Sequence, residues 1–263
     1  MARQNVRYAE VTFSASTHQF SLGIPFDVYF AGLTRGRLRA KTEFGVEIRW
    51  IFDIVRDIPD KELNRLRAEY TLAVAQEGMK DGVVALGLGG GEVNHPPEQY
   101  ATWFEKALAA GLHSAPHAGE TGGPESVWGA LQTLGAERIG HGARSIEDSR
   151  LITYLQGRQI PLEVCPTSNI CLGVYPDMSS HPLPRLYRAG IPISVNSDDP
   201  PLFNTTLNQE VRLLFNAFAF DTNTANDILL NGVRHSFLPR EEKRAMEAAF
   251  RKEMAQLQHD LSM

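Results

Sequence analysis

Three short polar motifs contain the side chains that are best suited to chemistry. His117 and Glu120 lie in the sequence His-Ala-Gly-Glu, His141 lies in Gly-His-Gly, and Asp198 and Asp199 precede a proline. Imidazole and carboxylate groups are common ligands of a borderline divalent cation such as zinc, which can activate a water molecule. Glu120 would lie near such a metal without binding it, as a general acid or base does. The motifs therefore predict a hydrolytic metal site, provided that the fold brings them together.

Each motif also has an interpretation without catalysis. A single histidine near the end of a strand is more often a hydrogen-bonded polar residue than a ligand, and Asp-Asp-Pro is a common turn sequence. The glycine-rich segment 87–91 lacks the Lys-Ser/Thr of a phosphate-binding loop, so it is a weak signal of nucleotide binding. Cys165 is expected to be a packed thiol. The histidines expected to have no ligand role are His18, His95, His113, His181, His235 and His259.

The elements that would position the motifs alternate between apolar runs and amphipathic stretches. The predicted strands are 6–13, 46–54, 82–88, 112–117, 138–141, 160–165 and 191–196. The predicted helices are 61–80, 97–110, 124–134, 146–157, 207–220, 225–232 and 239–258. Strands that alternate with helices in this way are typical of parallel βαβ units. Because the carboxyl ends of parallel barrel strands converge on one face, the polar motifs that follow these strands could meet there.

Composition restricts the class of protein. The chain has 263 residues, a formal net charge of −5, 43% hydrophobic and 22% charged residues, which is typical of a globular protein. The sequence has no apolar run long enough to predict a membrane span, and residues 1–10 lack the apolar core of a signal peptide. The presence of only two cysteines is typical of a protein in a reducing compartment. We therefore expect a cytoplasmic enzyme with a small-molecule substrate and with neither nucleic-acid nor membrane partners. No linker divides the sequence, so a single domain over 1–263 is expected.

Four motifs together resemble those of the adenosine deaminase family. They are HAGE at 117–120, RIGHG at 138–142, EVCPTSN at 163–169 and SVNSDDP at 194–200. Their order and spacing match from about residue 6 to the SFLP sequence at 236–239. The resemblance implies a TIM-like (β/α)8 barrel of the metallo-dependent hydrolase type, with one Zn²⁺ in a complete site. It also implies hydrolytic deamination of a 6-aminopurine nucleoside, which converts adenosine to inosine and ammonia.

The resemblance also implies roles for individual residues. By motif position, His117 and Asp198 would be zinc ligands. Glu120 would protonate N1 of the purine, and His141 would orient the water at the zinc. This division is chemically reasonable, because water needs a metal to ionise at neutral pH and the purine ring needs a proton to accept attack.

Two further residues would contact the substrate. Asp199 would form a hydrogen bond with N7 of the purine, and the backbone N–H of Gly90 would approach N3. A glycine at position 90 allows the backbone to come close to a planar base. Many relatives have an acidic residue after this glycine, where the present sequence has Gly91, followed by an unchanged Glu92.

The sequence departs from the family pattern at its beginning. The family begins with a strand that carries a zinc-binding His-x-His pair, and this sequence contains no His-x-His. The sequence at 8–13 resembles the family's second strand, so we expect seven strands and a missing first βα unit. A misplaced start codon or a truncated gene would account for this. We expect an open edge between 6–13 and 191–196 that could support oligomerisation, and impaired zinc binding and activity.

Other functions remain open at the sequence level. The first alternative is deamination of aminodeoxyfutalosine, a larger 6-aminopurine nucleoside of menaquinone synthesis. Free adenine is less favoured, because RIGHG and CPTSN resemble the nucleoside enzymes more closely. A non-catalytic remnant protein is a third alternative, which the absent histidine pair supports and the intact HAGE and SDDP motifs oppose.

Overall fold

The computed structural model describes residues 1–261, and the chain forms two compact units that divide between Glu147 and Asp148. Seven strands lie within the described residues, and the strands within each unit pair in parallel. Each strand begins and ends within two residues of its predicted bounds. The α/β class and the strand number predicted from the sequence are therefore confirmed. The assignment of 1–263 to a single domain stays a prediction.

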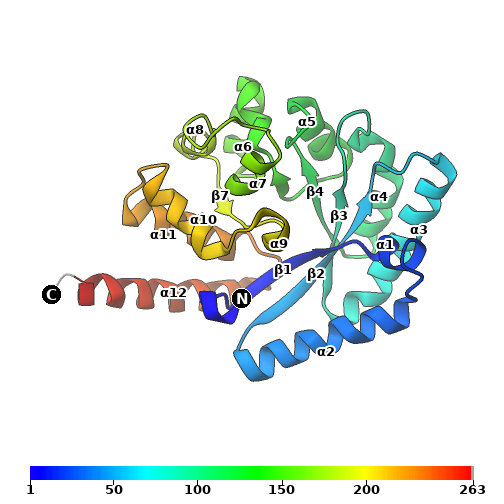
Figure 1. Ribbon diagram of the computed structural model, residues 1–263, viewed down its shortest axis with the longest axis horizontal. Coiled ribbons are helices and arrows are strands. Elements are labelled where there is room, and N and C mark those ends of the chain that lie inside the picture. Colours follow the sequence, from blue (N-terminus) through cyan, green and yellow to red (C-terminus); the bar gives the residue numbers. More distant parts are fainter. Residues whose placement is uncertain (262–263) are drawn as a thin grey trace. The chain divides into compact units, whose positions relative to one another are not determined.

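The first unit is built around a five-stranded parallel sheet (Figure 1). Its strands pair in chain order: β1 (Tyr8–Phe13), β2 (Glu47–Val55), β3 (Val83–Gly89), β4 (His113–Ala118) and β5 (Ile139–His141). Among the described residues of this unit, β1 pairs with β2 and forms the edge of the sheet. Parallel order places the carboxyl ends of all five strands on the same side of the unit.

Helices connect these strands and cover one face of the sheet. They are α1 (Ala15–Phe20), α2 (Phe26–Phe44), α3 (Lys61–Gly78), α4 (Ala101–Ala109) and α5 (Pro124–Thr133). Large apolar side chains of the strands, such as Phe52 and Leu86, pack against helix residues such as Phe30 and Phe104. Since successive side chains of a strand alternate between the two faces, the opposite face carries the neighbouring positions, including Asp53.

The opposite face also contains a buried ion pair. Arg138 donates to Glu10 at 2.6 Å, and the Tyr8 hydroxyl donates to the same carboxylate. Both charged side chains are nearly inaccessible, with 5% and 6% of their surface exposed. Glu10 is therefore a structural residue of the sheet.

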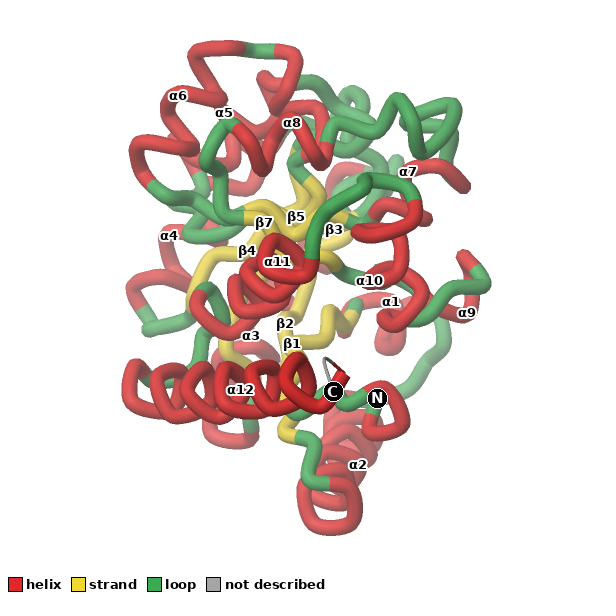
Figure 2. Tube along the Cα trace, turned by 90° about the vertical axis from the view of Figure 1, so that its left-hand side faces the viewer, coloured by secondary structure: helices red, strands yellow, loops and turns green. Residues whose placement is uncertain are grey.

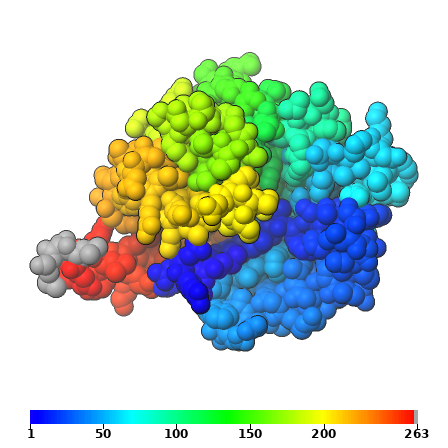
Figure 3. Space-filling model, in the orientation of Figure 1, coloured from blue at the N-terminus to red at the C-terminus, as the bar shows by residue number. Residues whose placement is uncertain are grey.

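Helix α2 is not among the helices that the sequence predicted. Its apolar residues do not lie on one side: Phe30 is buried, whereas Val28, Leu38 and Phe44 are more than half exposed. The helix covers part of the surface of the first unit, where it is coloured blue in Figure 3. An apolar pattern spread around a helix gives a weak periodic signal, which explains why the sequence did not reveal it.

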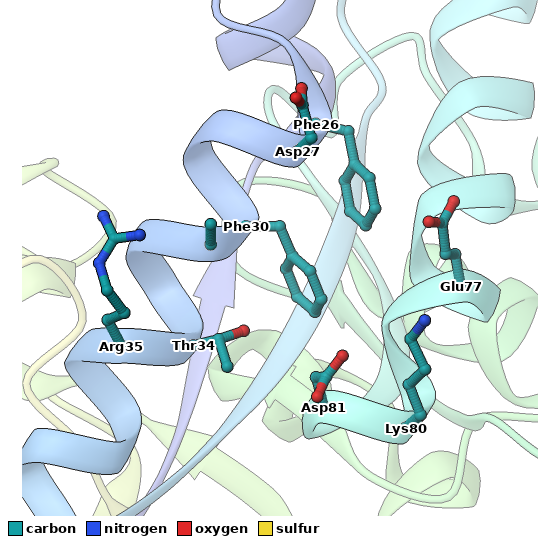
Figure 4. Close-up of a pocket in the computed structure, with 9 residues that line it drawn as sticks. Phe26, Asp27, Phe30, Thr34, Arg35, Glu77, Lys80 and Asp81 are labelled. Atoms are coloured by element: carbon teal, nitrogen blue, oxygen red, sulfur yellow. The ribbon is translucent and has the colours of Figure 1, made fainter.

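A groove of about 410 Å³ lies between α2 and the end of α3 (Figure 4). The rings of Phe26 and Phe30 form its apolar part, and Glu77, Lys80 and Asp81 line the other side. Lys80 and Asp81 precede β3, so this groove is at the amino ends of the strands rather than at the carboxyl ends that carry the polar motifs.

The second unit has two parallel strands and a mostly helical remainder. The strands are β6 (Leu162–Val164) and β7 (Ile193–Val195). The helices are α6 (Ser149–Arg158), α7 (Pro166–Cys171), α8 (Leu183–Arg188), α9 (Pro200–Phe203), α10 (Leu207–Asn216), α11 (Thr222–Arg234) and α12 (Arg240–Leu261). Helix α11 packs against β7 and against α12, which is the long helix in Figure 2. Within residues 1–261, the structure contains no helix with the length and apolar character of a membrane span.

Candidate active site

His117 lies at the carboxyl end of β4, directly opposite Gly140 of β5. A Cβ atom at position 140 would overlap the His117 ring, so the glycine provides the space that the ring occupies. The rings of His117 and His141 meet edge to face, with 4.8 Å between their centroids. The glycine of the RIGHG motif thus has a packing role that brings two of the predicted site residues together.

His141 ends β5 in a conformation that is unusual for its residue type. Its φ is +62°, in the left-handed region that non-glycine residues rarely occupy. Burial lowers its pKa from 6.5 to about 4, and the charge of Glu92 opposes this shift only in part. The imidazole is therefore neutral near pH 7. Strained backbone conformations and perturbed pKa values both cluster at functional sites.

Glu120 lies beside His141 in the turn that follows β4. An oxygen of its carboxylate is 3.5 Å from Nδ1 of His141. The turns after the two strands are also joined, because the backbone N–H of Gly142 donates to Ala118 and that of Arg144 donates to Gly119. The first unit therefore brings His117, Glu120 and His141 together, and their roles stay predictions.

Glu92 is a buried carboxylate that accepts five hydrogen bonds from the same turn. The donors are the four consecutive backbone N–H groups of 119–122 and the hydroxyl of Ser126, at distances of 2.6–2.8 Å. Burial by itself would raise the pKa of Glu92, but the hydrogen bonds and the charge of Arg56 outweigh it and hold the pKa below its ordinary value. The carboxylate is thus ionised at neutral pH.

Arg56 is fully buried at the carboxyl end of β2. Its guanidinium donates to the backbone carbonyls of Leu88 at 3.0 Å, Gly89 at 3.2 Å and His117. Burial lowers the pKa of Arg56, and the negative charge of Glu92 opposes that shift. Arg56 therefore links the ends of β2, β3 and β4, and Glu92 supplies a compensating charge.

Gly90 follows β3 and is exposed, with a φ of +82°. A Cβ at this position would overlap the carboxylate of Asp57, and it would lie 3.3 Å from the backbone nitrogen of Arg56. The left-handed conformation and the neighbouring Asp57 both favour glycine here. Gly90 is accessible at the end of β3, and its contact with the substrate stays a prediction from the family resemblance.

The second unit carries Asp198 and Asp199 after β7. Asp198 has a left-handed φ of +53° and accepts a hydrogen bond of 2.7 Å from the Ser168 hydroxyl of the CPTSN motif. Asp199 is exposed, and desolvation together with the charge of Asp198 raises its pKa. The buried Glu210 accepts from the N–H of Thr167 and so anchors the start of α7. The CPTSN motif thus positions Asp198 within this unit.

Three histidines with no expected ligand role have ordinary hydrogen-bond partners. His18 contacts the carbonyl of Ser14, His113 pairs with Glu137, and His181 contacts the side chain of Asn169. Cys165 is buried, in agreement with a packed thiol.

Sequence reasoning assigned no role to Arg56, and it noted Glu92 without giving it one. Arg56 comes directly after β2, and Glu92 follows the glycines that come after β3. A charged residue at such a position is the signal that the sequence offers for both. Arg56 binds backbone carbonyls of β3 and β4, and Glu92 binds backbone N–H groups of the turn after β4. These groups are about 25 residues or more away in the chain, and no sequence pattern marks them.

The fold and the polar strand ends together define a parallel α/β protein of the class whose sites lie at the carboxyl ends of the strands. The adenosine deaminase family model matches residues 1–252. The chain therefore belongs to the adenosine deaminase family.

Two curated relatives illustrate the range of this similarity. The aminodeoxyfutalosine deaminase of Streptomyces coelicolor is 44% identical over 242 residues, which are 90% of this chain and 60% of the relative. The adenine deaminase of Cupriavidus necator is 37% identical over 239 residues, which are 91% of this chain and 66% of the relative. The chain thus spans about 60–66% of the length of these proteins.

Solved structures show the same fold. A zinc-bound amidohydrolase from Burkholderia ambifaria has a TM-score of 0.92 and 28% identity, covering 99% of this chain and 71% of that one. An adenine deaminase from Arthrobacter aurescens has a TM-score of 0.86 and 29% identity, covering 97% of this chain and 75% of that one. The predicted fold class, that of metallo-dependent hydrolase barrels, is confirmed.

Proposed function

We propose that this chain carries most of the active site of a zinc-dependent deaminase, and that its substrate is the 6-aminopurine nucleoside aminodeoxyfutalosine. The observation that carries the reaction type is the group formed by His117, Glu120 and His141 at the carboxyl ends of β4 and β5. Two aminodeoxyfutalosine deaminases are 44% and 42% identical to the chain, whereas the adenine deaminases are 36–39% identical. This difference favours aminodeoxyfutalosine over adenine, and we propose aminodeoxyfutalosine in place of adenosine, which the sequence motifs alone put first.

The donor chemistry of the chain fits a zinc ion. His117 offers an imidazole and Asp198 a carboxylate, and each is fixed by its own neighbours: Gly140 for the ring and Ser168 for the carboxylate. Zinc, when bound, would lower the pKa of a water molecule so that it can attack at neutral pH. The zinc reported in the Burkholderia ambifaria structure supports this proposal.

Glu120 would transfer a proton in the reaction, and His141 would orient the attacking water. In hydrolytic deamination, the oxygen of water adds to C6 of the purine, the bond from C6 to the amino nitrogen breaks, and ammonia leaves. Glu120 would donate a proton to N1 and so make C6 electrophilic. The neutral imidazole of His141 lies within 3.5 Å of Glu120 and would orient the attacking water. Both roles need a fixed geometry, which the joined turns after β4 and β5 provide.

Asp199 and Gly90 are the proposed contacts with the purine. Gly90 directly follows β3, Asp199 lies in the turn after β7, and each is exposed, so a ligand could reach both. Asp199 would bind at N7, and the backbone N–H of Gly90 would face N3. A cytoplasmic location and oligomerisation through an open sheet edge remain predictions.

Parallel assays of zinc content and ammonia release would test the proposal. The substrates are aminodeoxyfutalosine, adenosine and adenine, and the proteins are the 263-residue chain and a version extended by an upstream segment with a His-x-His pair. A catalytic zinc usually has three protein ligands, so we expect weak zinc binding and low activity in the 263-residue chain. The extended chain should hold one zinc and deaminate aminodeoxyfutalosine fastest.

The other outcomes distinguish the alternatives. A zinc-loaded extended chain that deaminates none of the substrates would identify a non-catalytic remnant. Preference for adenine or adenosine would reassign the substrate. Full activity and stoichiometric zinc in the 263-residue chain would mean that another residue completes the site, and His18 and His95 would be tested first.

A further inference from the structure

Glu92 is a buried, ionised carboxylate that has no part in the proton transfers proposed above. Only 6% of its surface is exposed, and all five of its hydrogen bonds go to the segment that carries Glu120 and the first turn of α5. One oxygen accepts from Gly119 and Ser126, and the other accepts from three successive N–H groups, at 120–122. The turn after β4 is therefore folded around this carboxylate.

We propose that Glu92 is a positioning residue for Glu120, because it fixes the backbone that holds the Glu120 carboxylate beside His141. This inference rests on the proposed function, in which Glu120 moves the proton. Glu92 acts through Glu120 and does not itself touch the reacting atoms.

The arrangement is specific for a carboxylate. Successive N–H groups that point inward form a concave site for an anion, and here the anion is a side chain of the protein itself. An amide of the same shape presents one oxygen and one NH2 group, so one half of it would place donors against donors. A neutral or amide residue at position 92 therefore cannot satisfy both groups of N–H donors.

Close packing in the turn depends on the same side chain. A Cβ atom at Gly122 would lie 3.2 Å from both Cβ and Cδ of Glu92, closer than ordinary contact. On the other side of the turn, the carbonyl of His117 accepts from Arg56, whose positive charge also favours the ionised Glu92. The segment 117–122 is thus fixed through its carbonyl at one end and through its N–H groups at the other.

Backbone hydrogen exchange on the 263-residue chain would test the inference without any substrate. In Glu92→Gln, the amides at 119–122 should exchange at least about tenfold faster, because charge-assisted hydrogen bonds are lost. The imidazole NMR signals of His141 should shift as well, since Glu120 lies 3.5 Å away. Glu105→Gln makes the same chemical change at an exposed position of α4 and should alter neither measurement.

Two further variants separate positioning from folding. Ser126→Ala removes one donor to Oε1 of Glu92, the oxygen that also accepts from Gly119. The N–H groups of 120–122 bind the other oxygen, so their exchange should change less than about twofold. Glu92→Asp keeps the charge but withdraws the carboxylate by one methylene, so it should speed exchange at 120–122 even if Glu92→Gln does not fold.

Kinetics on the zinc-loaded enzyme provide a separate measurement. Glu92→Gln should lower kcat by about 10²-fold with little change in KM, since a small misplacement of a catalytic group has such an effect. Unchanged exchange and unchanged His141 signals in Glu92→Gln or Glu92→Asp would overturn the inference, as would faster exchange with an unaltered kcat. If the unmodified enzyme deaminates no purine, the proposed function fails, and the exchange data still decide whether Glu92 positions Glu120.

Discussion

Replacing Arg56 by leucine should destabilise the first unit strongly, because this change removes a buried charge and leaves several buried partners. Arg56 is 0% exposed and donates to three backbone carbonyls, of Leu88, Gly89 and His117. A buried polar group that loses its partner costs about 1–3 kcal/mol, and breaking a buried charge pair costs about 3–5 kcal/mol. These costs overlap, so we expect a loss of about 3–5 kcal/mol in the free energy of unfolding.

Urea unfolding followed by tryptophan fluorescence would measure this loss. The three tryptophans, Trp50, Trp103 and Trp128, all lie within residues 1–147, so the signal reports on the first unit. Arg56→Lys keeps the charge but cannot reach all three carbonyls, and it should have a smaller effect. The matched control is Arg65→Leu, which removes an exposed arginine of α3 and should leave the midpoint nearly unchanged.

A double-mutant cycle would test the link between Arg56 and Glu92. If their charges compensate each other, Arg56→Leu combined with Glu92→Leu should cost at least about 1 kcal/mol less than the sum of the single changes. A loss below about 1 kcal/mol in Arg56→Leu would refute the argument from burial. Strict additivity in the cycle would refute the electrostatic coupling, whatever the size of the single effects.

Three further predictions concern the site and its surroundings. Glu120→Gln should lower turnover by about 10²–10⁴-fold while the zinc content is unchanged, and loss of metal without loss of rate would instead make Glu120 a ligand. Gly140→Ala should displace the His117 ring and weaken zinc binding, measured by competition with a chelator, whereas Gly157→Ala, with open space around its Cβ position, should not. Burial lowers the pKa of His181 from 6.5 to about 4, so the unfolded state binds its proton first as the pH falls. The stability of the second unit should therefore decrease between about pH 6.5 and 4, by about 3 kcal/mol from this residue, and His181→Leu should remove that part of the pH dependence in urea unfolding monitored by circular dichroism.

The sequence by itself determined the strands and the places of the polar motifs relative to them. Apolar runs that alternate with amphipathic stretches placed all seven strands within two residues of their bounds. The histidine and carboxylate motifs follow those runs directly, so their common position at the carboxyl ends of strands was also predictable. Helix α2 was not predicted, because its apolar residues are spread around the helix and form no single apolar face.

Only the tertiary structure decided how the site is fixed. Glu92 binds N–H groups that lie 27–30 positions further along the chain, and Arg56 binds a carbonyl 61 positions away. Every residue except proline has the same N–H and carbonyl groups, so the sequence cannot show which of them a buried charge will meet. The left-handed backbone of His141 is likewise imposed by the joined turns and not by its residue type. Residue types specify the chemistry, but the three-dimensional pairing of buried charges with backbone groups specifies its geometry.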